Sequence, residues 1–147
     1  MSSFFDVQVK YLRYHLGVAH HARGMCAVLS AVSPSGEIFV LDEIIRGVDS
    51  STSLEDFAVQ VQKDWHHTVE VQVGPPSRML RSLRPRRLIW LYYQIKNSNL
   101  AIAPHCIAVD EAISEFDYSV DHPGESILAA LTWGLAPYYL EKELNNE

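Results

Sequence analysis

Cysteine is scarce in this sequence, and its two cysteines do not suggest a disulfide framework. Cys26 and Cys106 each lie in or beside an apolar run, and no spacing typical of metal ligands connects them. They therefore predict buried, reduced thiols and a cytoplasmic location.

Long apolar runs are also absent. No stretch approaches the ~20 apolar residues that a membrane-spanning helix needs. The first residues lack an apolar segment followed by a small-residue cleavage site, so we expect no signal peptide. Basic residues are few, since 12 Lys and Arg stand against 18 Asp and Glu and leave a net charge of -6. Any contact with DNA must therefore come from a local patch.

No phosphate-binding loop can be found. Gly17 and Gly24 fit neither the GxGxxG nor the GxxxxGK[ST] spacing, which excludes a motor ATPase, as does the length of 147 residues. No Ser-His-Asp or Cys-His arrangement can be defended. The chain is 48% hydrophobic and 20% charged, an ordinary globular composition. Its length suits one domain over residues 1–147.

The apolar pattern predicts an α/β fold. It first predicts strands near residues 8–19, 25–32 and 37–45, with a hairpin turn at 33–36. Thr52 and Glu55 then resemble a capping box that opens a helix. The remaining pattern predicts that this helix ends near residues 66–67, and that a strand at 69–73, a helix at 86–96, a strand at 100–103, a helical turn or two at 107–116 and a last helix from Pro123 follow.

This order of elements is that of RNase H-like folds. It predicts a mixed sheet whose first three strands are antiparallel and whose later strands are added through right-handed crossover helices. We expect the fourth strand to lie parallel beside the first. Functional sites of such sheets lie at the carboxyl ends of strands, near a switch in strand order. That rule indicates residues 18–21, residues 73–76 and the start of the last helix.

Several segments, spread over most of the chain, together resemble one known family. Residues 16–21 resemble its first strand, and the hairpin at 33–43, which closes with Asp42-Glu43, resembles its second and third. The run at 100–106, an acidic helix with Glu111 and Glu115, and residues 121–125 resemble its ending, where an Asp-His-x-x-Asp motif opens the last helix. The family is the nuclease domain of large terminase subunits, the viral DNA-packaging enzymes.

The resemblance implies an RNase H-like fold and DNA cleavage by two Mg²⁺ or Mn²⁺ ions held by converging carboxylates. The family places one Asp in the first strand, one at the end of the fourth and one at the last helix. Here Ala19 and Val73 are degenerate positions, and no Asp or Glu occurs between positions 13 and 36. Asp121, with Glu125 one turn later, is left as a vestigial or partial catalytic site. Two carboxylates cannot hold two divalent ions, so we expect no cofactor.

Other readings of these residues stay open. Asp121 and Glu125 also fit an ordinary helix start, and Asp42 and Glu43 a solvated strand end. If the domain is active, these four carboxylates would form a rearranged Mg²⁺ or Mn²⁺ site. A zinc site is a further hypothesis, which would combine Asp121 with histidines chosen from His20, His21 and His122.

The strongest basic feature is a group of five arginines within ten positions: Arg78, Arg81, Arg84, Arg86 and Arg87. We expect an exposed loop that leads into the next helix and contacts phosphate groups, unless these arginines pair with acidic residues elsewhere. We expect the neighbouring Trp90, Tyr92 and Tyr93 in the core or in an interface.

The sequence thus favours a degenerate, phage-derived terminase-nuclease-like domain. We expect it to act as a binding or assembly module on DNA or on a phage packaging protein, in the cytoplasm of the host cell if a phage encodes it. The first alternative is an active metal-dependent DNA endonuclease with the rearranged acidic site. The second is an α/β interaction domain with no viral connection.

Overall fold

The computed structural model describes residues 12–65, 69–74, 83–116 and 125–139. No helix among these residues is long and apolar enough to cross a membrane. The strands are β1 (Arg13–His21), β2 (Gly24–Val32), β3 (Ile38–Arg46), β4 (Val69–Val73) and β5 (Leu100–Ile102). The helices are α1 (Leu54–Gln62), α2 (Leu83–Lys96), α3 (Ile107–Ser114) and α4 (Glu125–Gly134).

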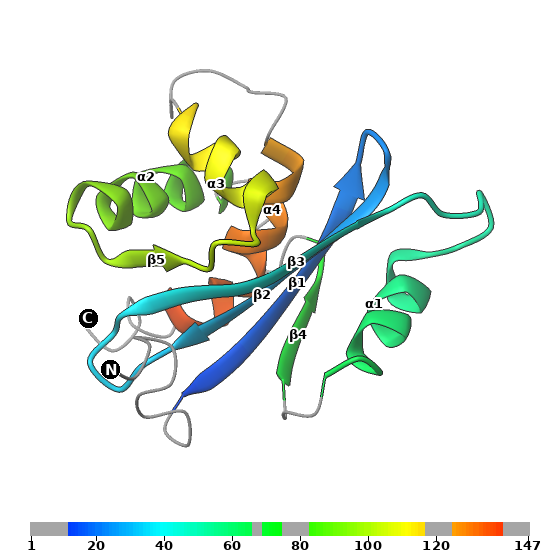
Figure 1. The fold of residues 1–147 in the computed structure, drawn as a ribbon, viewed down its shortest axis with the longest axis horizontal. Coiled ribbons are helices and arrows are strands. Elements are labelled where there is room, and N and C mark those ends of the chain that lie inside the picture. The colour runs from blue at the N-terminus through cyan, green and yellow to red at the C-terminus, as the bar shows by residue number, and fades with distance from the viewer. Residues whose placement is uncertain (1–11, 66–68, 75–82, 117–124, 140–147) are drawn as a thin grey trace.

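The strands form one mixed sheet in the order β4-β1-β2-β3-β5 (Figure 1). Strands β1, β2 and β3 are antiparallel neighbours, and β4 lies parallel beside β1. The predicted α/β class and the predicted place of the fourth strand are confirmed, and the arrangement is compatible with an RNase H-like class. Strand β5 does not lie beside β4. It pairs in parallel with β3 and forms the opposite edge of the sheet.

Local hydrogen bonds explain where two of the elements begin. The predicted hairpin turn forms with Gly36 donating its amide to the carbonyl of Ser33 at 2.9 Å, and Gly36 has a φ of 89°. Helix α1 is capped by Ser53, whose hydroxyl accepts the amide of Asp56 at 3.0 Å. The prediction that Thr52 is the cap is wrong by one residue, because Thr52 belongs to the preceding turn.

Other boundaries also differ from the prediction. Helix α1 ends at Gln62, not near residues 66–67, because the amide of Trp65 closes a turn onto the carbonyl of Gln62 at 3.2 Å. Helix α2 starts at Leu83, three residues before the predicted start, since Pro85 is tolerated in a first turn. The predicted start of the last helix at Pro123 lies outside the described residues.

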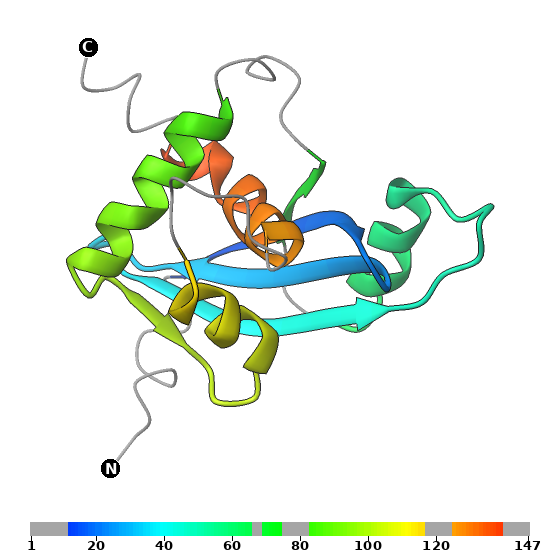
Figure 2. The same cartoon turned by 90° about the horizontal axis from the view of Figure 1, so that it is seen from above.

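Helices cover both faces of the sheet, with α1 on one side and α2, α3 and α4 on the other (Figures 1 and 2). Because strand side chains alternate between faces, each strand contributes to two cores. The α1-side core includes Leu16, Val18, Met25, Phe57 and Val61. The α4-side core includes Ala19, Cys26 and Val28, together with the predicted inward residues of α4: Ile127, Leu128, Leu131 and Leu135.

Helix α4 rests directly on the backbone of β1 at two glycines. A Cβ atom added to Gly134 would lie 2.6 Å from the amide nitrogen of Gly17, and one added to Gly17 would overlap the carbonyl oxygen of Ala130. Only residues without a side chain allow this approach. Figure 1 shows that α4 starts near the carboxyl end of β1 and runs back along it. The glycine contact therefore fixes the start of α4 close to the end of β1.

Candidate functional site

The candidate site lies where β1, β3, β4 and β5 end, at one edge of the sheet that we call the carboxyl edge. These four strands point the same way, because β4 is parallel to β1, β5 is parallel to β3, and β2 separates β1 from β3 as their antiparallel neighbour. The start of α3 follows β5 at this edge, and the start of α4 lies near β1 (Figure 1). The carboxyl edge is where α/β sheets bind ligands.

Ala19 lies in the buried part of this region. It pairs with Cys26 across β1 and β2, packs into the α4-side core and is 1% exposed. A methyl group in an apolar, enclosed position offers no ligand to a metal ion. The first-strand carboxylate that the terminase resemblance implies is therefore absent, and apolar packing occupies its place.

The structure does not bring Ala19 and Val73 together. Val73 pairs with Val18 and packs against the α1-side core, so its side chain lies on the opposite face of the sheet from Ala19. On the Ala19 face, the β4 residue nearest to the carboxyl edge is Gln72, whose side-chain amide donates to the carbonyl of Gly74 at 3.0 Å. A carboxylate at position 73 would therefore lie on the other face of the sheet from one at position 19.

Glu43 is engaged in holding α3 against the sheet. One oxygen of its carboxylate accepts the amide of Ala108 at 3.0 Å, and the other accepts the amide of Val109 at 2.9 Å. The residue at the N-cap position, Cys106, makes no side-chain capping bond. A carboxylate from β3 thus supplies the cap that α3 lacks, where the helix dipole favours negative charge.

Asp42, the neighbour of Glu43, is directed elsewhere. Its Oδ1 accepts the amide of Glu43 at 2.9 Å and lies 3.5 Å from Nε2 of His105. The side chains of Asp42 and His105 are 38% and 63% exposed, so their attraction is screened by water. Asp42 and Glu43 consequently do not present their carboxylates together as a ligand pair.

The remaining predicted ligands lie only partly within the described residues. Asp121 and His122 lie outside the described residues, as does the side chain of Glu125. Of the two histidines that end β1, His20 is exposed and His21 accepts the amide of Arg23 on its Nδ1 at 3.0 Å. Within the described parts of the chain, no group of three or more His, Cys, Asp or Glu residues could hold a metal ion.

The two cysteines near Glu43 are buried thiols, as the sequence predicted. Burial raises the pKa of Cys26 to about 12, and the negative charge of Glu43 adds to the rise. Burial likewise raises the pKa of Cys106 to about 12, with contributions from Glu43 and Asp42. Thiols that stay protonated at neutral pH are poor nucleophiles and poor metal ligands.

Three of the five arginines lie at the start of α2, not in a loop as predicted. Arg84, Arg86 and Arg87 belong to the helix, whose first turn holds no acidic residue, whereas Arg78 and Arg81 lie outside the described residues. Cations at a helix N-terminus oppose the dipole but add to the positive potential there. The start of α2 is therefore a region where an anion would be stabilised.

Two aromatic residues of α2 lie outside the core, so of the two predicted locations, core or interface, only an interface is left for them. Tyr92 and Tyr93 are 37% and 51% exposed, whereas Trp90 is half-buried and stacks on Tyr139 with ring centroids 4.6 Å apart. The signal was present in the sequence, because six consecutive apolar or aromatic residues at 88–93 cover every side of a helix. Such a helix cannot bury all of them against one sheet.

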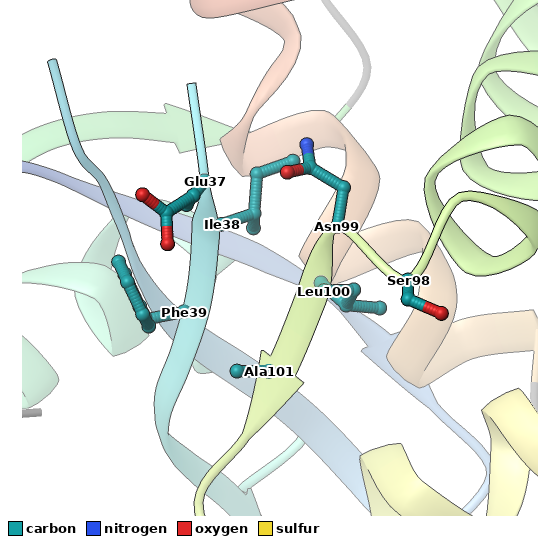
Figure 3. A pocket seen from close by; sticks show the side chains of 7 residues that line it. All are labelled: Glu37, Ile38, Phe39, Ser98, Asn99, Leu100 and Ala101. Atoms are coloured by element: carbon teal, nitrogen blue, oxygen red, sulfur yellow. The ribbon is translucent and has the colours of Figure 1, made fainter. Parts of the chain in front are cut away.

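A hollow of about 200 Å³ lies between the beginnings of β3 and β5, at the end of these strands away from the carboxyl edge (Figure 3). Asn99 ties its walls together, because its side-chain amide donates to the carbonyl of Gly36 at 2.9 Å and to Oε1 of Gln94 at 2.7 Å. Ligand pockets usually measure ~300–1,000 Å³. Even with the solvent space at its mouth included, the hollow is smaller than such pockets.

The comparisons with known proteins add no relative. No protein-family model, no curated protein and no solved structure matches this chain. The fold and the residues at the carboxyl edge and on α2 are therefore the features that bear on function.

Proposed function

We propose that the chain is a degenerate relative of terminase nuclease domains that acts as a binding and assembly module and does not cut DNA. The observation that carries this proposal is Ala19, which is 1% exposed in the apolar core where a metal-binding carboxylate would have to stand. Two-metal cleavage needs carboxylates that converge on both ions. A buried methyl group at the centre of that arrangement removes the chemistry but keeps the fold.

The acids near the site support the same proposal. Glu43 uses both oxygens on the amides of Ala108 and Val109, so its carboxylate already has a structural role. On β4, the face that Ala19 shares carries the amide Gln72 nearest to the carboxyl edge. The acid on that face, Glu70, lies toward the start of the strand and forms an ion pair with Arg13 at 2.9 Å. A rearranged nuclease site would have to draw on Asp42, Asp121 and Glu125 without Glu43.

Cleavage assays test the proposal directly. Purified protein incubated with plasmid and linear DNA in Mg²⁺ or Mn²⁺ should leave both intact. Neither ion should raise the melting temperature, because a ligand that does not bind the native state cannot stabilise it. Robust cleavage that disappears in Asp121→Asn or Asp42→Asn would show that the acids are recruited from elsewhere, and the proposal would be wrong.

The start of α2 supports contact with the phosphates of DNA as one binding activity. Arg84, Arg86 and Arg87 lie within or next to the first turn, which holds no acidic residue. DNA should bind weakly, with an affinity that falls steeply with salt, because each neutralised phosphate releases counterions. Replacing all three arginines with Ala should lower the affinity and reduce the salt slope by ~2–3. Arg23→Ala, in the exposed turn after β1, is the matched control.

DNA binding measured by fluorescence anisotropy at several salt concentrations decides this point. Absence of binding at low salt, or the same slope for the triple variant and the native chain, would reject the arginines as a phosphate site. The module would then have to bind protein alone.

A further inference from the structure

Helix α2 presents apolar and aromatic side chains on two faces. Its inner face packs on the α4-side core through Leu91, which is fully buried, and through Ile95. Its outer face exposes Ile89 (49%), Tyr92 (37%) and Tyr93 (51%). These three residues occupy positions i, i+3 and i+4, so they form one stripe along the helix. We call them, together with Lys96 at i+7, the outer stripe of α2.

The outer stripe has an ordered arrangement. The rings of Tyr92 and Tyr93 meet edge to face with centroids 5.6 Å apart, and Nζ of Lys96 lies 6.0 Å from the centre of the Tyr92 ring. Aromatic groups held by neighbours lose little conformational freedom on binding. Tyrosine is enriched at the centres of protein interfaces, where its ring is buried and its hydroxyl reaches the polar rim.

The stretch of sequence that contains the outer stripe carries charge of one sign. Residues 71–109 contain six of the 12 basic residues and no Asp or Glu, so all 18 acidic residues lie in the rest of the chain. The helix itself carries Arg84, Arg86, Arg87 and Lys96 and no acid. A chain with a net charge of -6 thus concentrates positive charge on the element that also exposes apolar side chains. The surface is complementary to a partner that is both acidic and apolar.

We propose that the outer stripe of α2 is a docking site for an acidic amphipathic helix of a partner protein. The inference rests on the proposed function as a binding module and names the class of partner. An apolar stripe at i, i+3 and i+4 matches the spacing with which one helix packs on another. Ile89 favours protein over nucleic acid, because an aliphatic side chain gains by burial against Leu and offers a base no stacking surface.

A second copy docking through the same face is disfavoured by charge. In a two-fold dimer α2 would face α2, and two helices with only basic charges would repel. The chain does have an acidic helix of its own, since α3 carries Asp110 and Glu111 and exposes Ile107 by 62%. The α3 helix of a second copy is therefore the competing occupant of the outer stripe, and its binding gives a distinct result in the test.

The test uses the full chain and a synthetic helical peptide of about 20 residues, with Leu on one face at helical spacing and Glu on the other. Two control peptides carry Lys in place of Glu, or the same residues in scrambled order. The double variant Ile89→Ala with Tyr93→Ala removes the centre of the outer stripe but keeps good helix formers. The matched control is Val59→Ala, a 53% exposed apolar residue on α1.

Fluorescence anisotropy should show that the acidic peptide binds and that both control peptides do not. The double variant should bind the acidic peptide at least 10-fold more weakly, whereas Val59→Ala should match the native chain. Circular dichroism should show that both variants stay folded. Equal binding of the scrambled or basic peptide, or unchanged affinity in the double variant, would overturn the inference.

Two further outcomes would also overturn it. The first is that a poly(dT) oligonucleotide competes with the acidic peptide and that the double variant no longer binds this oligonucleotide. That result would assign the outer stripe to nucleic acid. A concentration-dependent oligomer, measured by light scattering and abolished both by the double variant and by Ile107→Asp, would assign it to a second copy. The cleavage and salt-slope experiments do not involve Ile89 or Tyr93, so failure of this inference leaves the proposed function separately testable.

Discussion

Glu43 provides the sharpest test of how the candidate site is used. In the native chain its two oxygens accept the amides of Ala108 and Val109 at 3.0 and 2.9 Å, and α3 has no other side-chain cap. Glu43→Ala leaves both amides without their acceptor. Loss of a helix cap costs about 0.5–2 kcal/mol, and loss of the charge at the dipole about 0.3–1 kcal/mol more. We expect the free energy of unfolding to fall by about 1–3 kcal/mol.

For a domain of this size, each 1 kcal/mol corresponds to a change of about 2–4 °C in melting temperature. Thermal unfolding of Glu43→Ala should therefore show a melting temperature lower by roughly 2–12 °C, and urea unfolding should show the corresponding loss of free energy. The stability of Glu43→Gln, which keeps one acceptor oxygen, should lie between those of Glu43→Ala and the native chain. Hydrogen exchange at the amides of Ala108 and Val109 should accelerate in Glu43→Ala. The matched control is Glu111→Ala on the exposed face of α3, which should change stability by no more than about 0.5 kcal/mol.

The reasoning is refuted if Glu43→Ala is as stable as the native chain and those two amides keep their protection. It is also refuted if the native chain binds Mn²⁺ and Glu43→Ala abolishes that binding without loss of stability. The first result would show that Glu43 does not cap α3, and the second would show that Glu43 is a metal ligand.

Two other features give direct predictions. Gly17→Ala and Gly134→Ala each place a methyl group against backbone atoms, so each should lower the free energy of unfolding in urea by at least about 3 kcal/mol. Gly47→Ala is the control and should be tolerated, because its added Cβ would have its nearest neighbour at 3.6 Å. Equal effects of all three substitutions would disprove the close contact. Burial raises the pKa of Cys26 and Cys106 to about 12 from an ordinary 9.0, so their contribution to stability is complete below pH 9 and disappears as the pH rises toward 12. Loss of stability over this range should be less steep in Cys26→Ala, and parallel curves would contradict the burial argument.

The sheet could be predicted because its causes are local. Alternating apolar residues and the turn that ends at Gly36 specify the hairpin, and the change of period after Ser53 specifies the helix that follows. The exact cap could not be predicted, because Thr52 with Glu55 and Ser53 with Asp56 offer the same spacing. Only the hydrogen bond from the amide of Asp56 to Ser53 distinguishes them.

Less of the candidate site could be predicted from the sequence, because the site depends on strand register and on contacts between residues far apart in the chain. The absence of acids in β1 is visible in the sequence, but whether position 72 or 73 shares a face with Ala19 is decided by the pairing of Val18 with Val73. The bond between Glu43 and the amides of α3 joins residues far apart in the chain, and no local pattern signals it.

The place of β5 has a consequence for the order in which the domain assembles. Strands β1, β2 and β3 follow one another through short turns, so their pairing closes small loops at little entropic cost. Strand β5 reaches β3 only through a long excursion, since Val40 pairs with Ile102, and α3 and α4 come later still in the chain. Long-range pairing of this kind is slow. During synthesis on the ribosome, we therefore expect β1, β2 and β3 to pair first. The face of this meander that α4 covers should stay exposed to solvent until α4 has been synthesised and can pack on it.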